Sequence, residues 1–265
     1  MLSCTEDNDP VKKRSSKSKT SVIKQKRIYL DSLDHMYFSG FNWLMIKETS
    51  DYPLSEYCDS DPQNAFVDNS NVLHLLLSEK NNKKTGIILE IDTTLGYGVF
   101  SFDIITDLYE MDPDAYFTFS LINVDKNKSE KISEIGMRFT NPENKSGEVP
   151  LQYFIYTTAE KVPYEFDYEK TYPELSLTKH LIEIDSEFIR LSSFEGFLDY
   201  QSSEFFEYIF DFSDSDIKIE VPAKVKIRLS FCHKNDVPET ISNDSANIEI
   251  IGIDFVDSYK YYSRY

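Results

Sequence analysis

The sequence predicts an all-β protein built as an antiparallel two-sheet β-sandwich, and three observations support this. Short apolar or alternating segments recur about every ten residues from Ile28 onward. β-Branched and aromatic residues dominate these segments, and no long stretch keeps helical spacing. The breaks between them are short and rich in Asn, Asp, Ser, Gly and Pro. Many evenly spaced strands without helices indicate a sandwich or barrel, and we expect one domain over residues 28–265.

Each expected strand is a short run that begins and ends at such a break. In chain order the strands are 71–79, 85–93, 98–106, 115–124, 133–140, 151–158, 177–196, 205–212, 223–232 and 246–259. Side chains alternate along a strand, so one set in each should enter the core. We expect Ile135, Met137 and Phe139 to be buried. The side chains of Phe100 and Phe102 should point to the opposite face of their strand from those of Val99 and Ser101.

Charge divides the chain into a basic leader and an acidic body. Residues 1–27 contain eight Lys or Arg against three acidic residues, a net charge of +5, and the remainder has a net charge of −23. A body this acidic repels phosphate backbones, which excludes nucleic acid as its partner. The leader has dense like charge and few apolar groups, so we expect a disordered tether. A nuclear signal in residues 10–19, or a segment lying against anionic lipid, is the alternative.

The first residues contain a candidate lipidation site. Leu2, Ser3 and Cys4 stand in the order of a bacterial lipobox, whose cysteine is acylated, and an acidic run follows as in Bacteroidota surface lipoproteins. The apolar segment of a signal peptide is missing before Cys4. Two interpretations therefore stay open: a lipoprotein of the bacterial outer membrane or cell surface, or a soluble cytosolic protein. No segment could span a bilayer, so membrane contact is expected only through a lipid on Cys4.

The remaining cysteines and the histidines indicate no metal or cofactor. An oxidising location would permit a bridge between Cys58 and Cys232, but two buried free thiols are the simpler expectation. The sequence has neither a CxxC motif nor a His/Cys cluster, so no structural metal is predicted. The histidines are scattered, and each is expected to be an ordinary strand residue: His35, His74, His180 and His233.

Five short motifs occur in a particular order along the chain. They are FSGFNW (38–43), GYGVFSF (96–102), YFTFSLI (116–122), EIGMR (134–138) and IEIIGIDFVDSY (248–259). This order resembles the domain of glycoside hydrolase family 16, the laminarinase and lichenase group. The corresponding family patterns are FSG..W, GYG-x-F/Y-x-F, AFWLL, the catalytic E-I-D-I-E (or a variant with one bulged residue) and EIDYVRVY. The resemblance runs from about residue 31 to 259 and implies a concanavalin A-like jelly roll.

The resemblance implies that the catalytic strand carries Glu134, Gly136 and Arg138 on one face. A retaining glycosidase needs two carboxyl groups about 5–5.5 Å apart, one as nucleophile and one as acid/base. Here only the first position keeps a carboxylate. The guanidinium of Arg138 stays charged at any working pH, and the bulged alternative, Phe139, has no proton to give. The row therefore predicts a degenerate, non-catalytic site, in which Arg138 is expected to pair with Glu134. If the register is off by one, these groups are surface residues.

Three functions stay open. The first is a catalytically inactive sandwich that acts as a cell-surface or periplasmic interaction protein, such as an accessory lipoprotein of an outer-membrane assembly. The second is a glycan-binding module, although the single tryptophan, Trp43, is expected to be structural. The third is an active hydrolase whose second carboxylate comes from elsewhere, such as Glu90 or Asp103. Partners are thus proteins or a surface glycan. The tyrosines proposed to line a glycan site are Tyr97, Tyr116, Tyr153 and Tyr156.

Overall fold

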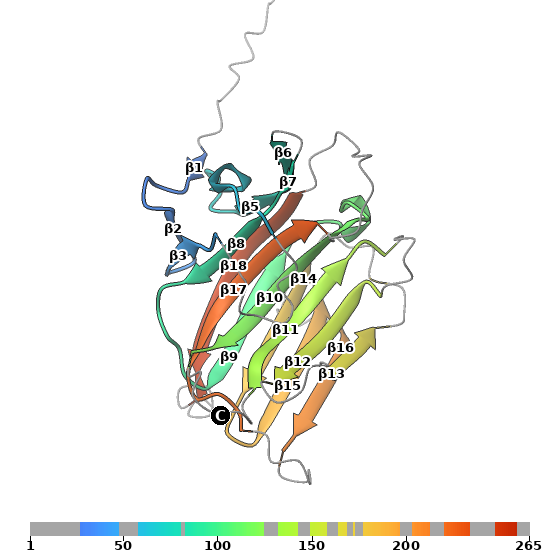
Figure 1. The fold of residues 1–265 in the computed structure, drawn as a ribbon. Helices are drawn as coiled ribbons and strands as arrows, with labels where there is room; N and C mark the ends of the chain where they lie inside the picture. The colour runs from blue at the N-terminus through green and yellow to red at the C-terminus, as the bar shows by residue number, and fades with distance from the viewer. Residues whose placement is uncertain are drawn as a thin grey trace, which may run out of the picture.

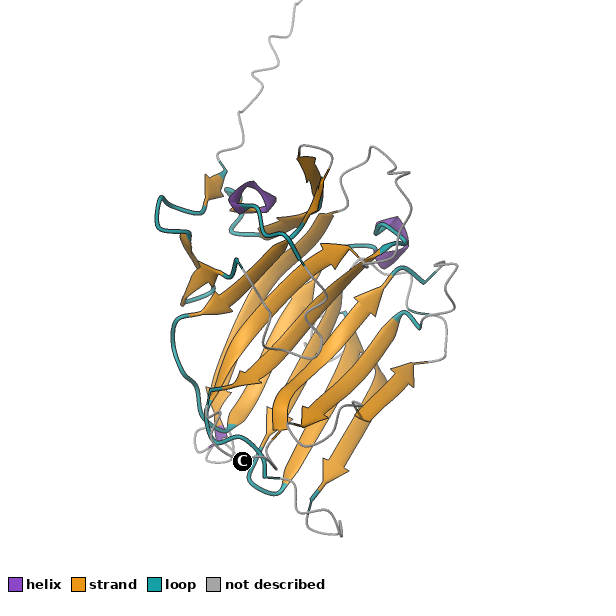
Figure 2. Ribbon diagram, viewed as in Figure 1, coloured by secondary structure: helices purple, strands orange, loops and turns teal. Residues whose placement is uncertain are grey.

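Two eight-stranded antiparallel sheets stack face to face (Figure 1). The computed structural model describes residues 27–47, 58–80, 83–124, 132–142, 149–157, 164–168, 172, 177–196, 203–212, 220–233 and 247–258. Strands dominate this part of the chain (Figure 2). Its helical residues are two single 3-10 turns, η1 (Pro62–Asn64) and η2 (Leu108–Glu110), and Ser258 at the end of the described part. The predicted antiparallel sandwich is confirmed. Residues 1–26 of the leader, Cys4 included, lie outside the described residues.

Strands distant in sequence are neighbours in both sheets. Sheet A has the order β1 (Ile28–Tyr29), β4 (Ala65–Val67), β5 (Leu73–Leu76), β18 (Asn247–Asp257), β9 (Gly98–Ile104), β14 (Thr178–Ile184), β15 (Phe188–Glu195) and β16 (Ser203–Asp211). Sheet B has the order β13 (Tyr164–Tyr168), β12 (Leu151–Thr157), β11 (Ile132–Thr140), β10 (Ala115–Asn123), β17 (Val225–His233), β8 (Ile87–Ile91), β3 (Phe41–Met45) and β2 (His35–Phe38). A separate hairpin consists of β6 (Ser78–Lys80) and β7 (Lys83–Thr85).

The alternation in each strand divides its side chains between the core and an outer face. Ile135, Met137 and Phe139 of β11 are fully buried in the main hydrophobic cluster, as expected. In β9, Phe100 and Phe102 are fully buried, while the intervening residues are half-buried. The apolar side chains of both sheets thus form one core, which places the opposite set of β11 on the outer face of sheet B, the face that points away from sheet A.

The FSG motif forms the turn between β2 and β3. Ser39 and Gly40 have φ values of 52° and 82°, which two-residue hairpin turns require. The Ser39 hydroxyl accepts a hydrogen bond from the backbone N–H of Ile253 in sheet A at 3.0 Å. Trp43 is fully buried, and its indole N–H donates to the Phe38 carbonyl oxygen at 3.1 Å. The prediction that Trp43 is structural is confirmed.

A chain of hydrogen bonds crosses the core between the sheets. His180 of β14 is fully buried, with Nδ1 2.7 Å from Ser193 Oγ and Nε2 2.9 Å from Thr178 Oγ1. From sheet B, the Tyr153 hydroxyl lies 2.7 Å from the same Ser193 oxygen and donates to the Phe206 carbonyl at 3.1 Å. Burial lowers the pKa of His180 to about 3. The ring is therefore neutral at neutral pH.

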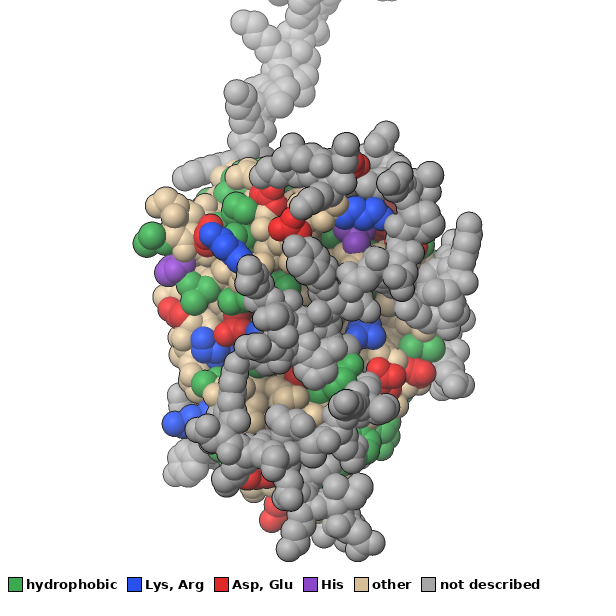
Figure 3. Space-filling model, viewed as in Figure 1, with side chains coloured by type: hydrophobic (Ala, Val, Ile, Leu, Met, Phe, Trp, Pro, Cys, Tyr) green, Lys and Arg blue, Asp and Glu red, His purple; other side chains and the backbone are tan. Residues whose placement is uncertain are grey.

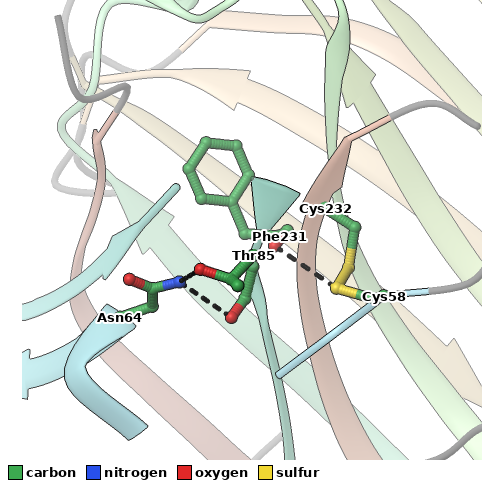
Figure 4. Close-up of a disulfide and its surroundings, with 6 residues drawn as sticks. Cys58, Asn64, Thr85, Phe231 and Cys232 are labelled. Atoms are coloured by element: carbon green, nitrogen blue, oxygen red, sulfur yellow. Dashed lines mark hydrogen bonds between the residues drawn. A yellow bond between two sulfur atoms is a disulfide. The ribbon is translucent and has the colours of Figure 1, made fainter. Parts of the chain in front are cut away.

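Cys58 and Cys232 form a disulfide, which corrects the expectation of two free thiols (Figure 4). Their Cα atoms lie 5.6 Å apart, although 174 positions separate them in the sequence. The bridge is buried, and Cys58 Sγ lies 3.9 Å from the carbonyl oxygen of Phe231 on β17. Next to it, the Asn64 amide donates to Thr85 Oγ1 at 3.1 Å. The sequence could not predict the pairing because it depends on the long-range placement of β17.

Replacing both Cys58 and Cys232 with Ala should lower the free energy of unfolding by about 2–5 kcal/mol, because the bridge closes a very long loop of the unfolded chain. Urea denaturation measures this loss, and Cys4→Ala is the control that should leave stability unchanged. Titration of the unreduced protein should find these two thiols blocked. Two free thiols at these positions would contradict the bridge.

Candidate functional site

The three β11 residues expected to be catalytic, Glu134, Gly136 and Arg138, lie on the outer face of sheet B, on a strand in the interior of the sheet. On β11, Gly136 pairs with Phe154 of β12 on one side and with Ser120 of β10 on the other. Ser120 in turn pairs with Arg228 of β17, and Arg228 pairs with Glu90 of β8. These five residues therefore form one row across neighbouring strands. Glu134 and Arg138 lie in the rows on either side of it.

The Phe154 ring occupies the space that a side chain at Gly136 would need. A Cβ at position 136 would lie 2.5 Å from Phe154 Cζ, 2.8 Å from the Phe119 carbonyl oxygen and 2.8 Å from Ser120 Cβ. Phe154 is itself fully buried. Position 136, between Glu134 and Arg138 on β11, therefore carries no carboxylate. Adding one would require the Phe154 ring and the backbone of β10 to move.

Glu134 is buried on this face, with 4% of its surface exposed. Its Oε2 atom has no hydrogen-bond partner. Burial raises the pKa of Glu134, and the positive charges of Arg228 and Arg138 oppose this rise. A nucleophile must be ionised and must reach its substrate. Burial of Glu134 favours its uncharged form and keeps its carboxyl group away from a substrate.

Arg138 does not form the expected ion pair with Glu134. In the described part of the chain no ion pair joins them, and the Nε atom of Arg138 has no hydrogen-bond partner. Its guanidinium carbon instead lies 5.8 Å from the centre of the Tyr116 ring. Burial raises the pKa of Tyr156 to about 12, and the nearby charge of Arg138 opposes the rise. The Phe154 ring, in the row between them, accounts for the missing pair.

Neither relocated carboxylate can serve as the proton donor for Glu134. Glu90 lies on β8, three strands from β11, which is roughly 14 Å at the usual strand spacing. Its carboxylate is paired with Arg228 at 2.8 Å and with Lys226 at 3.2 Å. Asp103 lies on β9 of sheet A, where it is paired with Lys179 at 3.1 Å. The interpretation as an active hydrolase with either donor is therefore not supported.

The four tyrosines do not share one face. Tyr116 and Tyr156 lie on the outer face of sheet B, on β10 and β12. Tyr153 points into the core, where its hydroxyl meets Ser193 of sheet A. Tyr97 precedes β9 of sheet A and packs against the core. Only Tyr116 and Tyr156 thus lie on the face expected to bind glycan, and both are buried there.

The sequence did not point to Phe154, Ser120 and Arg228, which lie level with Gly136 on the neighbouring strands of sheet B. Each lies at a position that alternates with core residues, so the period of two placed them on an outer face. The sequence does not determine the register between strands. It is this register that places Phe154 of β12 beside Gly136 of β11. The side of the molecule drawn in Figure 3 shows acidic and basic side chains interspersed among apolar ones.

Neither a metal cluster nor a membrane-spanning helix is present among the residues that the structure describes. Among them, no three His, Cys, Asp or Glu side chains are arranged to hold a metal ion. None of their helices has the length and apolar character needed to cross a membrane.

The fold is similar to solved structures of family 16 glycoside hydrolases. An endo-glucanase of that family from Bacteroides ovatus is 13% identical, with a TM-score of 0.61 over 87% of this chain and 99% of that one. A pseudo β-1,3-glucanase of Mycobacterium tuberculosis is also 13% identical, with a TM-score of 0.61 over 88% and 98% of the two chains. The β-glucanase of Bacillus licheniformis is 12% identical, with a TM-score of 0.58 over 88% and 98%.

No family model and no curated protein matches the sequence. The structural neighbours include both glucanases and a pseudo-glucanase. These likenesses show that the chain has a family-16-like jelly-roll fold.

Proposed function

We propose that this protein is a non-catalytic, family-16-like β-sandwich that acts through binding at the surface or in the periplasm of a bacterium. One observation carries the proposal: Phe154 fills the middle of the row in which glycosidases of this fold hold their carboxylates. The Phe154 ring lies between Glu134 and the guanidinium group of Arg138, and neither the ring nor the guanidinium can protonate a leaving oxygen. General acid catalysis contributes about 10²–10⁴-fold to such reactions, so its loss removes most of the activity.

The disulfide and the candidate lipobox support the proposed location. Disulfides persist in oxidising compartments and are rare in the cytosol, and Cys58 and Cys232 are bridged. A lipid on Cys4 would hold the acidic body at a membrane through the basic leader. Mass spectrometry of the protein from its native membrane tests this: an acylated Cys4 supports a lipoprotein, and an unmodified Met1 in the cytosolic fraction contradicts it.

The wild-type protein should release no reducing sugar from laminarin, lichenan, agarose or carrageenan, and Glu134→Gln should change nothing. The reason is that a nucleophile without a proton donor completes neither half of a double displacement. A reducing-end assay, with an active lichenase in the same buffer as positive control, makes the measurement. Wild-type turnover that Glu134→Gln abolishes would overturn the proposal.

Purification of tagged full-length protein from its native membrane distinguishes the two kinds of partner. A stoichiometric protein complex supports an accessory role in an assembly. Co-purified polysaccharide supports a glycan-binding module, the second function that the sequence left open. Tyr116 and Tyr156 lie on the outer face of sheet B but are both buried, so this purification decides between the two functions.

A further inference from the structure

We propose that the edge of the sandwich formed by β16 and β13 binds an extended segment of a partner protein, in which Lys or Arg alternates with apolar residues. The segment would add to sheet A as a further strand beside β16. This inference rests on the proposed function in taking a protein as the partner. It adds the surface that the partner contacts and the chemistry of the segment that binds there.

β16 and β13 are the last strands of their sheets, and they lie next to each other along one side of the sandwich (Figure 1). Aromatic rings join them. The Phe166 ring of β13 stacks on the Tyr208 ring of β16 with 3.5 Å between the ring centres, and Tyr164 meets Phe210 at 5.6 Å. These four rings are half-buried. Among the described strands, none pairs with the other side of β16 or of β13.

The strand register shows which backbone groups of β16 point to its free side. Opposite residues in an antiparallel pair alternate between pairs that exchange hydrogen bonds and pairs that do not. The Phe212 N–H donates to the Glu187 carbonyl oxygen at 2.9 Å, so every second residue before Phe212 bonds to β15. Ile209 and Glu207 lie between these residues, and their N–H and C=O groups therefore point away from β15. An added strand would pair with these groups.

β16 lacks the features that usually protect an edge strand from pairing. Such strands are often very short or contain Lys, Pro or a bulge. β16 has nine residues and neither Lys nor Pro, whereas the edge strands β1 and β2 on the other side of the sandwich have two and four residues. Its one register shift lies opposite Ser193 and Phe194 and leaves residues 206–211 regular. This length suits strand addition, a common way of binding an extended peptide.

The charges on this edge are acidic. Glu204 and Glu207 of β16 and Glu165 and Asp167 of β13 are exposed, and neither strand contains Lys or Arg. Arg190 of the neighbouring β15 pairs with Glu207 at 3.3 Å. Burial raises the pKa of Glu204, and the negative charge of Glu207 raises it further. A cation on a bound segment would relieve this repulsion, so the edge favours a basic partner.

Alternation along an added strand fixes the pattern of that partner. Tyr208 and Phe210 point toward β13, while Glu207 and Ile209 point to the outer face of sheet A, where Ile209 is 46% exposed. Successive side chains of the added strand would likewise alternate between these two sides. Residues beside Glu207 are favoured when basic, and residues beside the rings when apolar. The expected segment therefore alternates Lys or Arg with apolar residues.

Two occupants from this chain itself fit the edge less well. A second copy of β16 would bring acidic residues against acidic residues, which destabilises a strand pair. The basic leader attaches before β1, which lies seven strand spacings from β16 in sheet A, or about 34 Å. A chain spans at most about 3.6 Å per residue. Residues 19–27, which hold half of the eight basic residues of the leader, thus cannot reach β16 of the same molecule.

Fluorescence anisotropy of a labelled probe peptide with the full-length protein tests the proposal, at about 0.15 M salt to limit long-range attraction. The probe alternates Lys and Val, has blocked ends and matches the nine residues of β16. The reference peptide has the same composition and charge, with its Lys and Val residues in two separate blocks. We expect the alternating probe to bind at least about tenfold more tightly.

Variants of β16 separate strand addition from general charge attraction. Ile209→Pro removes an N–H of the free side without removing a hydrogen bond to β15, and it should weaken binding of the probe at least about tenfold. Ile209→Thr keeps the N–H and a high strand propensity, so it should bind as the wild type does. Melting curves of both variants establish that they are folded.

A second pair of variants tests the acidic charges and does not alter the backbone. Glu204→Gln combined with Glu207→Gln should weaken binding of the alternating probe at least about fivefold, because the cations of the probe lose their partners. Glu79→Gln is the matched control, since Glu79 is an exposed acidic strand residue on the separate hairpin β6–β7. It should leave the affinity unchanged.

Several outcomes would overturn the inference: equal binding of the alternating and block peptides, equal binding by Ile209→Pro and Ile209→Thr, or no binding of the probe by a folded wild-type protein. Self-association of the full-length protein that Ile209→Pro abolishes would assign the edge to a second copy, and it also counts against a partner protein. All of these leave the non-catalytic function standing. Release of reducing sugar from a glucan would instead refute that function and leave the edge site in place.

Discussion

Gly136→Ala should lower the free energy of unfolding by about 2–3 kcal/mol, a large effect for one methyl group. The added Cβ would lie 2.5 Å from the Phe154 ring and 2.8 Å from the Phe119 carbonyl oxygen. The ring is fully buried and has little room to move, and the carbonyl belongs to the strand ladder between β10 and β11. Urea denaturation of the purified variant measures the loss.

A matched glycine and a second-site change make this prediction specific. Gly96→Ala is the control, because a Cβ at Gly96 has no atom within 4 Å, and its stability should stay close to that of the wild type. Adding Phe154→Ala should recover part of the loss at Gly136, because it removes one of the two obstacles and leaves the carbonyl. If Gly136→Ala is as stable as Gly96→Ala, the Phe154 ring does not fill this space.

The same clash bears on any attempt to rebuild a catalytic row. Gly136→Asp combined with Arg138→Glu would place three carboxyl groups on one strand face, which costs stability through repulsion between like charges. The structure adds a steric cost, since the larger Asp side chain meets the same ring and carbonyl. We therefore expect this double variant to fold poorly rather than to gain activity.

The free energy of unfolding should fall by about 2 kcal/mol between pH 6.5 and pH 4.5 as His180 takes up a proton in the unfolded chain. Burial depresses the pKa of His180 to about 3 in the folded protein, against about 6.5 in the unfolded chain. Below pH 6.5 the unfolded state therefore binds a proton that the folded state does not, and stability is lost as the pH falls toward 3. The groups that face the ring are Ser193, Thr178, Tyr172, Phe102 and Phe139, with Lys179 adjacent in sequence.

Urea denaturation of the wild type and of His180→Gln at several pH values isolates this effect. The variant should be less stable at pH 7, because the buried hydrogen bonds to Ser193 and Thr178 are disturbed, and the difference should shrink as the pH falls. His35→Gln, at an exposed strand position, controls for the loss of a histidine as such and should keep the acid slope of the wild type. A constant difference between wild type and His180→Gln from pH 7 to pH 4.5 would contradict a neutral, buried His180.

The core assignments show what alternation in the sequence determined. Ile135, Met137 and Phe139, like Phe100 and Phe102, are buried as predicted, because a strand places every second residue on one face whichever strands lie beside it. Trp43 is also buried as expected, although the expected strands began only at residue 71 and left out β2 and β3, which flank the FSG turn. That Gly136 and Arg138 carry no carboxyl group follows from the residue identities, and that they share a face with Glu134 follows from the period of two.

Contacts between strands were decided by the tertiary structure alone. The disulfide depends on β17 passing Cys58, 174 positions earlier in the chain. Asp103 and Glu90 are both acidic residues on strands, yet one lies on sheet A and the other three strands from β11. Tyr153 and Tyr156 are three residues apart and face opposite sides of sheet B. Phe154 separates Glu134 from Arg138 because the register of β12 against β11 places its ring at Gly136. The alternation of apolar and polar residues in the sequence assigns each residue to one face of its own strand. Which residues of other strands it contacts there depends on register and strand order, and these come from the packing of the whole chain.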